Sequence, residues 1–304
     1  MHRTAFELKP ARPYSLSETV ARLVRFTTLV DRWTEDGEYS RCLFLDDALT
    51  LIAVRQSGTP ARAMLHVSLL SEKAATPAAL EQAEAFVRRS LGAACDLKSF
   101  YRSLRDDELL AESIRAHHGM ALCGGASFFE AIVTTVLAQQ VNLKFAYSIY
   151  DALTSRYGER LKVDGEERIA FPTAARISRV RDATLRNFKL TGGKAGAIAL
   201  IAKAIAKGEL DAAQLAELSD EEVILRLVAY KGIGRWTAET AMIRGLGRID
   251  VFPAGDLGVV KKIAMDMLGR TEVAREDEMR EFSERWRPYR SLALIYAYAS
   301  MYNS

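Results

Sequence analysis

The hydrophobic pattern of the chain changes near residue 96, and this change limits the fold more than any other feature. Before it, four short runs of alternating or β-branched apolar residues are separated by turn formers, which predicts an antiparallel sheet. These runs are TAFELK, RCLFLDD, LTLIAVRQ and RAMLHVSLL. After it, apolar residues recur at helical spacing, as in FFEAIVTTVLAQQVNLKFAYSIYDALTSRYG. We therefore expect an α+β protein, with a small sheet-and-helix domain over residues 1–96 and an all-helical domain over residues 97–304.

Two helices are predicted within the first domain. SLSETVARLVRFTTL begins with a Ser-x-x-Glu pattern, in which Ser15 and Glu18 would form a capping box. PAALEQAEAFVRRSLG has Pro77 near its start and Gly92 near its end, as helices often do.

Charge and cysteine content exclude several classes of protein. The 304 residues include 42 basic and 39 acidic side chains, so any site for a polyanion must come from local placement of charge. The three cysteines lie far apart without CxxC spacing, which argues against a disulfide framework, a zinc site or an iron–sulfur cluster. No run of 18 apolar residues and no signal-peptide pattern is present. We expect a cytoplasmic protein without a metal site, and we expect His117 and His118 to lie in an exposed turn.

The segment LVAYKGIGRWTAE, residues 227–239, places two glycines on either side of one isoleucine. Glycines this close together allow a tight hairpin between two helices and a close approach to the backbone. The N–H groups at the start of the second helix would suit a phosphate. Such a hairpin binds the backbone of a nucleic acid without sequence specificity. For the glycines alone, a plain turn between two packed helices is the alternative.

A longer segment, LVAYKGIGRWTAETAMIRGLGRIDVFPAGDLGVVKK, resembles the helix–hairpin–helix, the Gly/Pro-rich loop and the acid of the DNA base-excision glycosylases. More narrowly, it is similar to the alkylpurine branch, whose bacterial type is 3-methyladenine DNA glycosylase II. The resemblance extends through FFEAIVTTVLAQQVNL, GGKAGAIALIAKAI and WRPYRSLALIYAY. It implies that the helical domain is a glycosylase domain and that the small domain before it belongs to the same branch.

The resemblance also implies roles for individual residues. Asp256 takes the position of the catalytic aspartate, Trp236 and Tyr289 take positions of aromatic walls of the base pocket, and Thr240 stands where the type enzyme has a tyrosine. Gln140 takes the position of the residue that wedges into the duplex, where the type enzyme has an aliphatic side chain. The residues implied to bind the DNA backbone are Lys231, Gly232, Ile233, Gly234, Arg235 and Thr237.

Each of these residues also has a structural alternative. Asp256 could cap the helix that follows it, and Trp236 and Tyr289 could be core aromatics. Lys261 and Lys262 could contact phosphates or could belong to a solvated helix face. The chemistry favours the functional alternative for Asp256, because a carboxylate near the anomeric carbon stabilises the positive charge that develops as an N-glycosidic bond breaks.

Together these implications describe a monofunctional DNA glycosylase. It would flip out alkylated purines such as 3-methyladenine and 7-methylguanine and hydrolyse the N-glycosidic bond in base excision repair, leaving an abasic site for an endonuclease. Bifunctional members have a lysine at the position of Trp236, so no lyase step is expected. The alternatives are a glycosylase for another damaged or mispaired base and an inactive DNA-binding homologue. The partner would be damaged double-stranded DNA. The protein would be a monomer, associated with the nucleoid and without contact to a membrane. No cofactor is expected, apart from a monovalent cation at the hairpin in the DNA complex.

Overall fold

A computed structural model describes residues 1–26, 28–272 and 274–299. Its N-terminal part is a five-stranded antiparallel sheet with the order β1-β5-β4-β3-β2. The strands are β1 (His2–Leu8), β2 (Arg32–Trp33), β3 (Glu38–Leu45), β4 (Ala48–Ser57) and β5 (Met64–Ser71). The antiparallel sheet predicted from the alternating runs is therefore confirmed.

Two helices accompany the sheet, and both were expected. In α1 (Leu16–Val24), the Ser15 hydroxyl accepts the Glu18 N–H at 3.4 Å, which is one half of the predicted capping box. The Glu18 carboxylate instead lies 2.8 Å from Nδ1 of His117, so it ties α1 to the turn after α4. The second helix, α2 (Pro77–Ser90), has its proline in the first turn and contacts β3.

The rest of the chain is mainly helical, which confirms the α+β class. Several of its helices begin at a residue whose side chain accepts a backbone N–H, among them Ser127, Asn142, Thr191 and Ser219. The first helices are α3 (Leu97–Ser103), α4 (Ala111–Ala116), α5 (Phe128–Ala138), α6 (Leu143–Tyr157), α7 (Ala174–Ser178), α8 (Asp182–Arg186), α9 (Gly192–Ala206) and α10 (Ala212–Ala216). They are followed by α11 (Asp220–Val228), α12 (Arg235–Ala241), α13 (Leu257–Val260), α14 (Glu276–Ser283) and α15 (Arg290–Ala299).

Helix α5 is the centre of the helical part. Its sequence FFEAIVTTVLA is apolar on nearly every side, as expected of a helix surrounded by others, and it packs against α6, α9 and α12. It also packs against a π-helical turn, Met242–Leu246, that directly continues α12. The core around α5 is continuous with the core beneath the sheet, so one set of buried side chains joins both parts of the chain.

One local element departs from the expectation of helices alone after residue 96. The strands β6 (Arg160–Val163) and β7 (Glu166–Ile169) form a two-stranded hairpin between α6 and α7. Leu161 and Val163 of this hairpin pack on Cys42, Leu51 and Leu70 of the N-terminal sheet. The hairpin therefore covers part of the sheet face that would otherwise be exposed. The division at residue 96 stays a prediction, and α3 begins directly after it, capped by Asp96.

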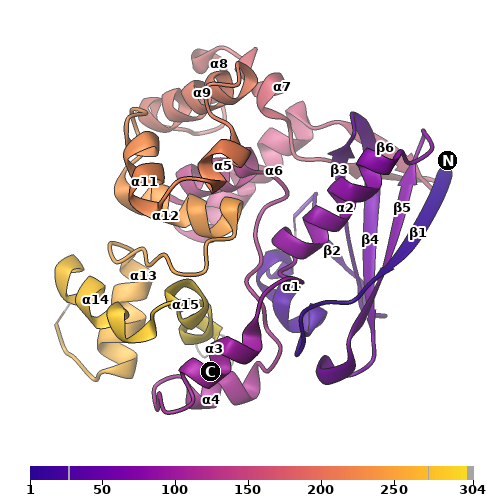
Figure 1. The fold of residues 1–304 in the computed structure, drawn as a ribbon. Helices are drawn as coiled ribbons and strands as arrows, with labels where there is room; N and C mark the ends of the chain where they lie inside the picture. Colours follow the sequence, from indigo (N-terminus) through magenta and orange to yellow (C-terminus); the bar gives the residue numbers. More distant parts are fainter. Residues whose placement is uncertain (27, 273, 300–304) are drawn as a thin grey trace.

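Figure 1 shows the helices in two groups beside the sheet. One group contains α5 to α12, and the other brings α3 and α4 next to α13, α14 and α15, although α4 ends at Ala116 and α15 begins only at Arg290. The chain passes from the first group to the second between residues 247 and 256, and Asp256 lies where this connection meets α13. No helix in the described part of the chain has the length and apolar composition needed to cross a membrane.

Candidate active site at the hairpin and Asp256

The hairpin between α11 and α12 needs its first glycine. Gly232 has a φ of 91°, which side chains disfavour, and a Cβ there would lie 2.9 Å from the Cβ of Ala197 in α9. Ile233 is buried, at 4% exposure, and fastens the hairpin to the core. The small residues of α9, which include Gly193 facing the same point, are what allow this close approach.

The second glycine has a different role from the first. Gly234 has an extended backbone (φ −93°, ψ 173°), and no heavy atom lies within 4 Å of the position that a Cβ would take. The turn itself therefore depends on Gly232 rather than on Gly234. Its missing side chain leaves open space in front of the start of α12, next to the exposed Lys231.

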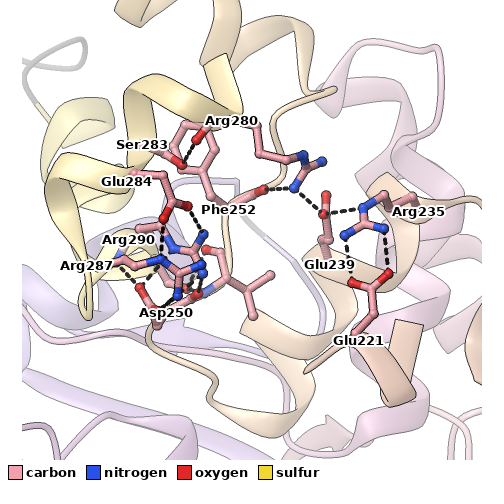
Figure 2. A network of polar contacts seen from close by, with 12 residues as sticks. Glu221, Arg235, Glu239, Asp250, Phe252, Arg280, Ser283, Glu284, Arg287 and Arg290 are labelled. Atoms are coloured by element: carbon pink, nitrogen blue, oxygen red, sulfur yellow. Dashed lines mark hydrogen bonds and ion pairs between the residues drawn. The ribbon is translucent and has the colours of Figure 1, made fainter. Parts of the chain in front are cut away.

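Arg235 was expected to bind the DNA backbone, but its guanidinium is held by carboxylates of the protein (Figure 2). It donates to both oxygens of Glu221 at 3.0 and 2.9 Å and, through Nε, to Glu239 at 3.0 Å. Glu239, with a side chain only 2% exposed, also accepts from Arg280 of α14 at 2.9 Å. Burial raises the pKa of Glu239, and the two arginines oppose this effect. The buried carboxylate thus ties the start of α12 to α14.

A second cluster of ion pairs holds the connection that leads to Asp256 (Figure 2). Asp250 accepts from Nε of Arg290 at 2.9 Å and from Nη1 of Arg287 at 3.0 Å. The next residue, Val251, exchanges hydrogen bonds with the hydroxyl of Ser291 at 2.9 and 2.7 Å. These contacts fasten the connection to the start of α15.

The loop between α5 and α6 lies against the hairpin. Gln140 is exposed and has a φ of 53°, so the loop presents it at a left-handed turn. Its neighbour Gln139 donates to the carbonyl of Gly232 at 3.1 Å and to the hydroxyl of Thr237 at 2.9 Å. Lys194 donates to the carbonyls of Leu137 and Gln139 at 3.0 and 2.7 Å, which fixes the loop from the side of α9.

Thr237 was expected among the residues that bind the DNA backbone. Its side chain is only 2% exposed and receives the Gln139 amide, so the hydroxyl lies behind the hairpin rather than on its outer surface. Gln139 itself was not predicted, although it stands next to Gln140 in LAQQVN. The two residues together link the predicted wedge to the hairpin.

Asp256 lies at the start of α13, and its carboxylate accepts hydrogen bonds from Trp236, Tyr298 and Gly258. The indole N–H of Trp236 reaches Oδ2 at 2.8 Å, and the Tyr298 hydroxyl and the Gly258 N–H reach Oδ1 at 3.0 and 2.8 Å. The Gly258 contact is the helix-capping bond expected of this residue. Trp236 and Tyr298 come from α12 and α15, so the carboxylate is oriented by both helical groups.

The aromatic side chain that α15 contributes is not the expected one. Tyr298 meets Asp256, whereas Tyr289 makes its ring contact with Phe100 of α3, edge-on at 5.8 Å between centroids. The segment WRPYRSLALIYAY contains three tyrosines, Tyr289, Tyr296 and Tyr298, and only packing decides which one faces the acid. Tyr289 as a pocket wall stays a prediction without a contact that supports it.

The remaining predicted residues are placed as follows. Thr240 lies one helical turn after Trp236, is 7% exposed, and its hydroxyl oxygen has no hydrogen-bond partner among the described groups. His118 is exposed, whereas His117 is partly buried against Glu18. Lys261 is exposed, and the side chain of Lys262 lies outside the described residues. Within the described part of the chain, no group of three or more His, Cys, Asp or Glu residues is arranged to hold a metal ion.

Comparison with known proteins identifies the family. Residues 133–288 match the model of the HhH-GPD superfamily of base excision DNA repair proteins, and residues 5–127 match the AlkA N-terminal domain. DNA-3-methyladenine glycosylase of Bacillus subtilis is 31% identical over 207 residues, which are 68% of each chain. The solved 3-methyladenine DNA-glycosylase of Archaeoglobus fulgidus superposes with a TM-score of 0.80, at 25% identity and 99% coverage of both chains.

A second solved structure was determined with DNA bound. It is the Schizosaccharomyces pombe 3-methyladenine DNA glycosylase Mag1 in complex with abasic DNA, which has a TM-score of 0.56 and 25% identity and covers 66% of this chain and 94% of its own. The chain belongs to the AlkA-type branch of the HhH-GPD superfamily of base excision DNA repair proteins.

Proposed function

We propose that this protein is a monofunctional DNA glycosylase that excises alkylated purines, such as 3-methyladenine and 7-methylguanine, in base excision repair. The observation that carries the proposal is the carboxylate of Asp256, held 2.8 Å from the indole nitrogen of Trp236 directly after the hairpin. The carboxylate of Asp256 would stabilise the positive charge on the sugar, and the indole of Trp236 would hold the base. The relatives named above have the same activity in their names.

DNA would lie across the outer surface of the hairpin. Gly234 leaves open space there, Lys231 is exposed next to it, and backbone N–H groups at the start of α12 suit a phosphate oxygen. Since Arg235 is held by Glu221 and Glu239, we assign it mainly to holding the hairpin, and we assign Thr237 to holding the wedge loop. Gln140, exposed at its left-handed turn, would fill the gap that the flipped nucleotide leaves.

Hydrolysis would proceed through a sugar with oxocarbenium character. Asp256 would stabilise the positive charge at the anomeric carbon and orient the attacking water. The hydrogen bonds from Trp236, Tyr298 and Gly258 keep the carboxylate in one position, so little reorganisation accompanies the reaction. The indole ring of Trp236 would stack on the base and attract a methylated, positively charged purine.

Base release without strand cleavage follows from the side chain at position 236. An indole nitrogen cannot form the Schiff base on which a lyase step depends. The product would be an abasic site for a separate endonuclease, and one chain supplies every group that the reaction needs. The monomeric state, the nucleoid-associated cytoplasmic location and a monovalent cation at the hairpin carbonyls stay predictions.

The test is base release from alkylated duplex DNA, with chromatographic identification of the free base. We expect Asp256→Asn to abolish release while duplex binding survives, because the change removes the charge and keeps the shape. Equal turnover by the variant and the parent would show that Asp256 only caps α13. Release of a different base would indicate a glycosylase for another lesion, and DNA binding without any release would indicate an inactive homologue.

A further inference from the structure

A partly open cavity lies where α1 and the sheet meet α5, α6 and the turn after α12. The space inside it is about 590 Å³ when the open solvent at its mouth is included. Its wall is more polar than that of an ordinary core void. The ionisable and polar groups that line it include Arg22, Asp31, Arg41, Glu130, Tyr150 and Arg244.

The acidic side of this cavity is already occupied by protein groups. Nη2 of Arg41 donates to both oxygens of Glu130 at 2.9 and 2.7 Å, and its Nη1 donates to Asp31 at 3.2 Å. The hydroxyls of Tyr39 and Tyr150 donate to Asp31 and Glu130 at 2.5 and 2.8 Å. Burial also raises the pKa of Asp31, which reduces its negative charge.

The two arginines on the other side of the cavity lack such contacts with protein groups. Neither Arg22 nor Arg244 makes an ion pair or a side-chain hydrogen bond within the described residues, although both are partly buried. Both lie close enough to Cys123 and Tyr147 to oppose the rise in pKa that burial causes in these two groups. Two guanidinium groups that no described acceptor engages therefore line one cavity, and they can donate to a ligand that supplies acceptors.

One lining residue of the cavity lies near the Asp256 site, and a neighbouring pocket lies near the Gln140 loop. The guanidinium carbon of Arg22 lies 5.9 Å from the ring centroid of Tyr298, whose hydroxyl is 3.0 Å from Asp256. At the other end, a narrower pocket continues along Tyr147 and Arg244 to Ala138 and Leu143, the residues on either side of the Gln140 loop. A base displaced by Gln140 would thus enter beside the wedge.

We propose that this cavity receives the edge of the flipped base and that Arg22 and Arg244 select purines with a carbonyl oxygen at position 6. Guanidinium groups donate hydrogen bonds and accept none, so they fit the 6-oxo group of 7-methylguanine or hypoxanthine. The 6-amino group of 3-methyladenine presents further donors to them and leaves the arginines unsatisfied. This inference rests on the proposed glycosylase function.

The experiment compares lesions that differ at position 6 but have equal charge. Methylated DNA supplies 7-methylguanine and 3-methyladenine, which are both cationic, and matched duplexes supply hypoxanthine and mispaired adenine, which are both neutral. Single-turnover release of each base is measured for the parent, for Arg22→Met and for a control, Arg25→Met. The control removes the same charge from the end of the same helix, at a side chain that lies over Phe26.

We expect Arg22→Met to lower the ratio of 6-oxo to 6-amino release about tenfold or more in both pairs, the effect of a lost hydrogen bond to a charged donor. Arg25→Met should leave both ratios unchanged. If Arg22→Met folds poorly, Arg244→Met tests the same cavity from its other wall. An equal loss of all four bases would overturn the selectivity and assign Arg22 to supporting Tyr298. No release by the parent protein would instead refute the glycosylase function itself.

Discussion

The two hairpin glycines provide a matched pair of substitutions. Gly232→Ala should destabilise the protein, because its φ of 91° is unfavourable for alanine by about 1–2 kcal/mol. The new Cβ would also lie 2.9 Å from the Cβ of Ala197, well inside normal contact, and moving α9 away adds about 1–3 kcal/mol. The expected loss in the free energy of unfolding is therefore roughly 2–5 kcal/mol.

Gly234→Ala should behave differently, two residues further along the chain. Its backbone is extended and the space around a Cβ is open, so the free energy of unfolding should change by less than about 0.5–1 kcal/mol. DNA affinity should fall nonetheless, because the new methyl group occupies space that a phosphate would use. The loss should be similar for every duplex sequence, since phosphate contacts position a protein without specifying bases.

The assays are urea denaturation followed by tryptophan fluorescence and fluorescence anisotropy with a labelled duplex at several salt concentrations. Gly234→Val, with a larger side chain, should weaken binding further at the same stability. The reasoning would be refuted if Gly234→Ala destabilised the fold as much as Gly232→Ala does, or if Gly232→Ala had no effect. A loss of binding confined to one sequence context would contradict the backbone-binding role of the hairpin.

Three further predictions concern other contacts. Trp236→Phe keeps an aromatic ring but removes the hydrogen-bond donor to Asp256, so single-turnover excision should slow about tenfold. Trp236→Ala should cost about 1–3 kcal/mol of transition-state stabilisation, because it also removes stacking on the base. Unchanged rates would contradict the role of Trp236 in the base pocket. Glu239→Gln should lower the free energy of unfolding by about 1–3 kcal/mol, because an amide cannot neutralise two arginines, and equal urea midpoints would show that the network is dispensable. Burial raises the pKa values of Cys42 and Cys95 to about 11, so iodoacetamide at pH 8 should alkylate these thiols slowly until the protein is denatured, as followed by mass spectrometry. The free energy of unfolding should fall as the pH rises from 9 to 11, because only the thiols of the unfolded chain ionise there. Rapid labelling of the native protein would refute this.

Local patterns predicted most of the elements of this protein. Alternating apolar runs predicted the sheet, and the caps at Ser15 and Pro77 placed the first helices to within a residue or two. The hairpin β6–β7 was missed, because RLKV and EERI are too short and too polar to register as strands. Their pairing depends on Leu161 and Val163 meeting the N-terminal sheet, a contact between distant parts of the chain.

The candidate site was predicted in its hairpin and its acid, but not in its second aromatic residue. Tyr289 precedes α15, which begins at Arg290, whereas Tyr298 lies in the last turn of that helix. Spacing along the chain therefore does not show which of the two tyrosines faces the acid. Only the packing of α3 against α15 decides that Tyr289 meets Phe100 and that Tyr298 meets Asp256.

The sequence by itself determined the features that depend on neighbouring residues: the turn at Gly232, the helix starts, and the position of Asp256 at the cap of α13. These rest on backbone sterics and local hydrogen bonds, which act over a few residues. The tertiary structure alone decided that Arg235 is held by Glu221 and Glu239, that Gly234 faces open space, and that Arg22 of the first helix lies over Tyr298 near the end of the chain. Such contacts join residues far apart in sequence, and they exist only because the folded core brings those segments together.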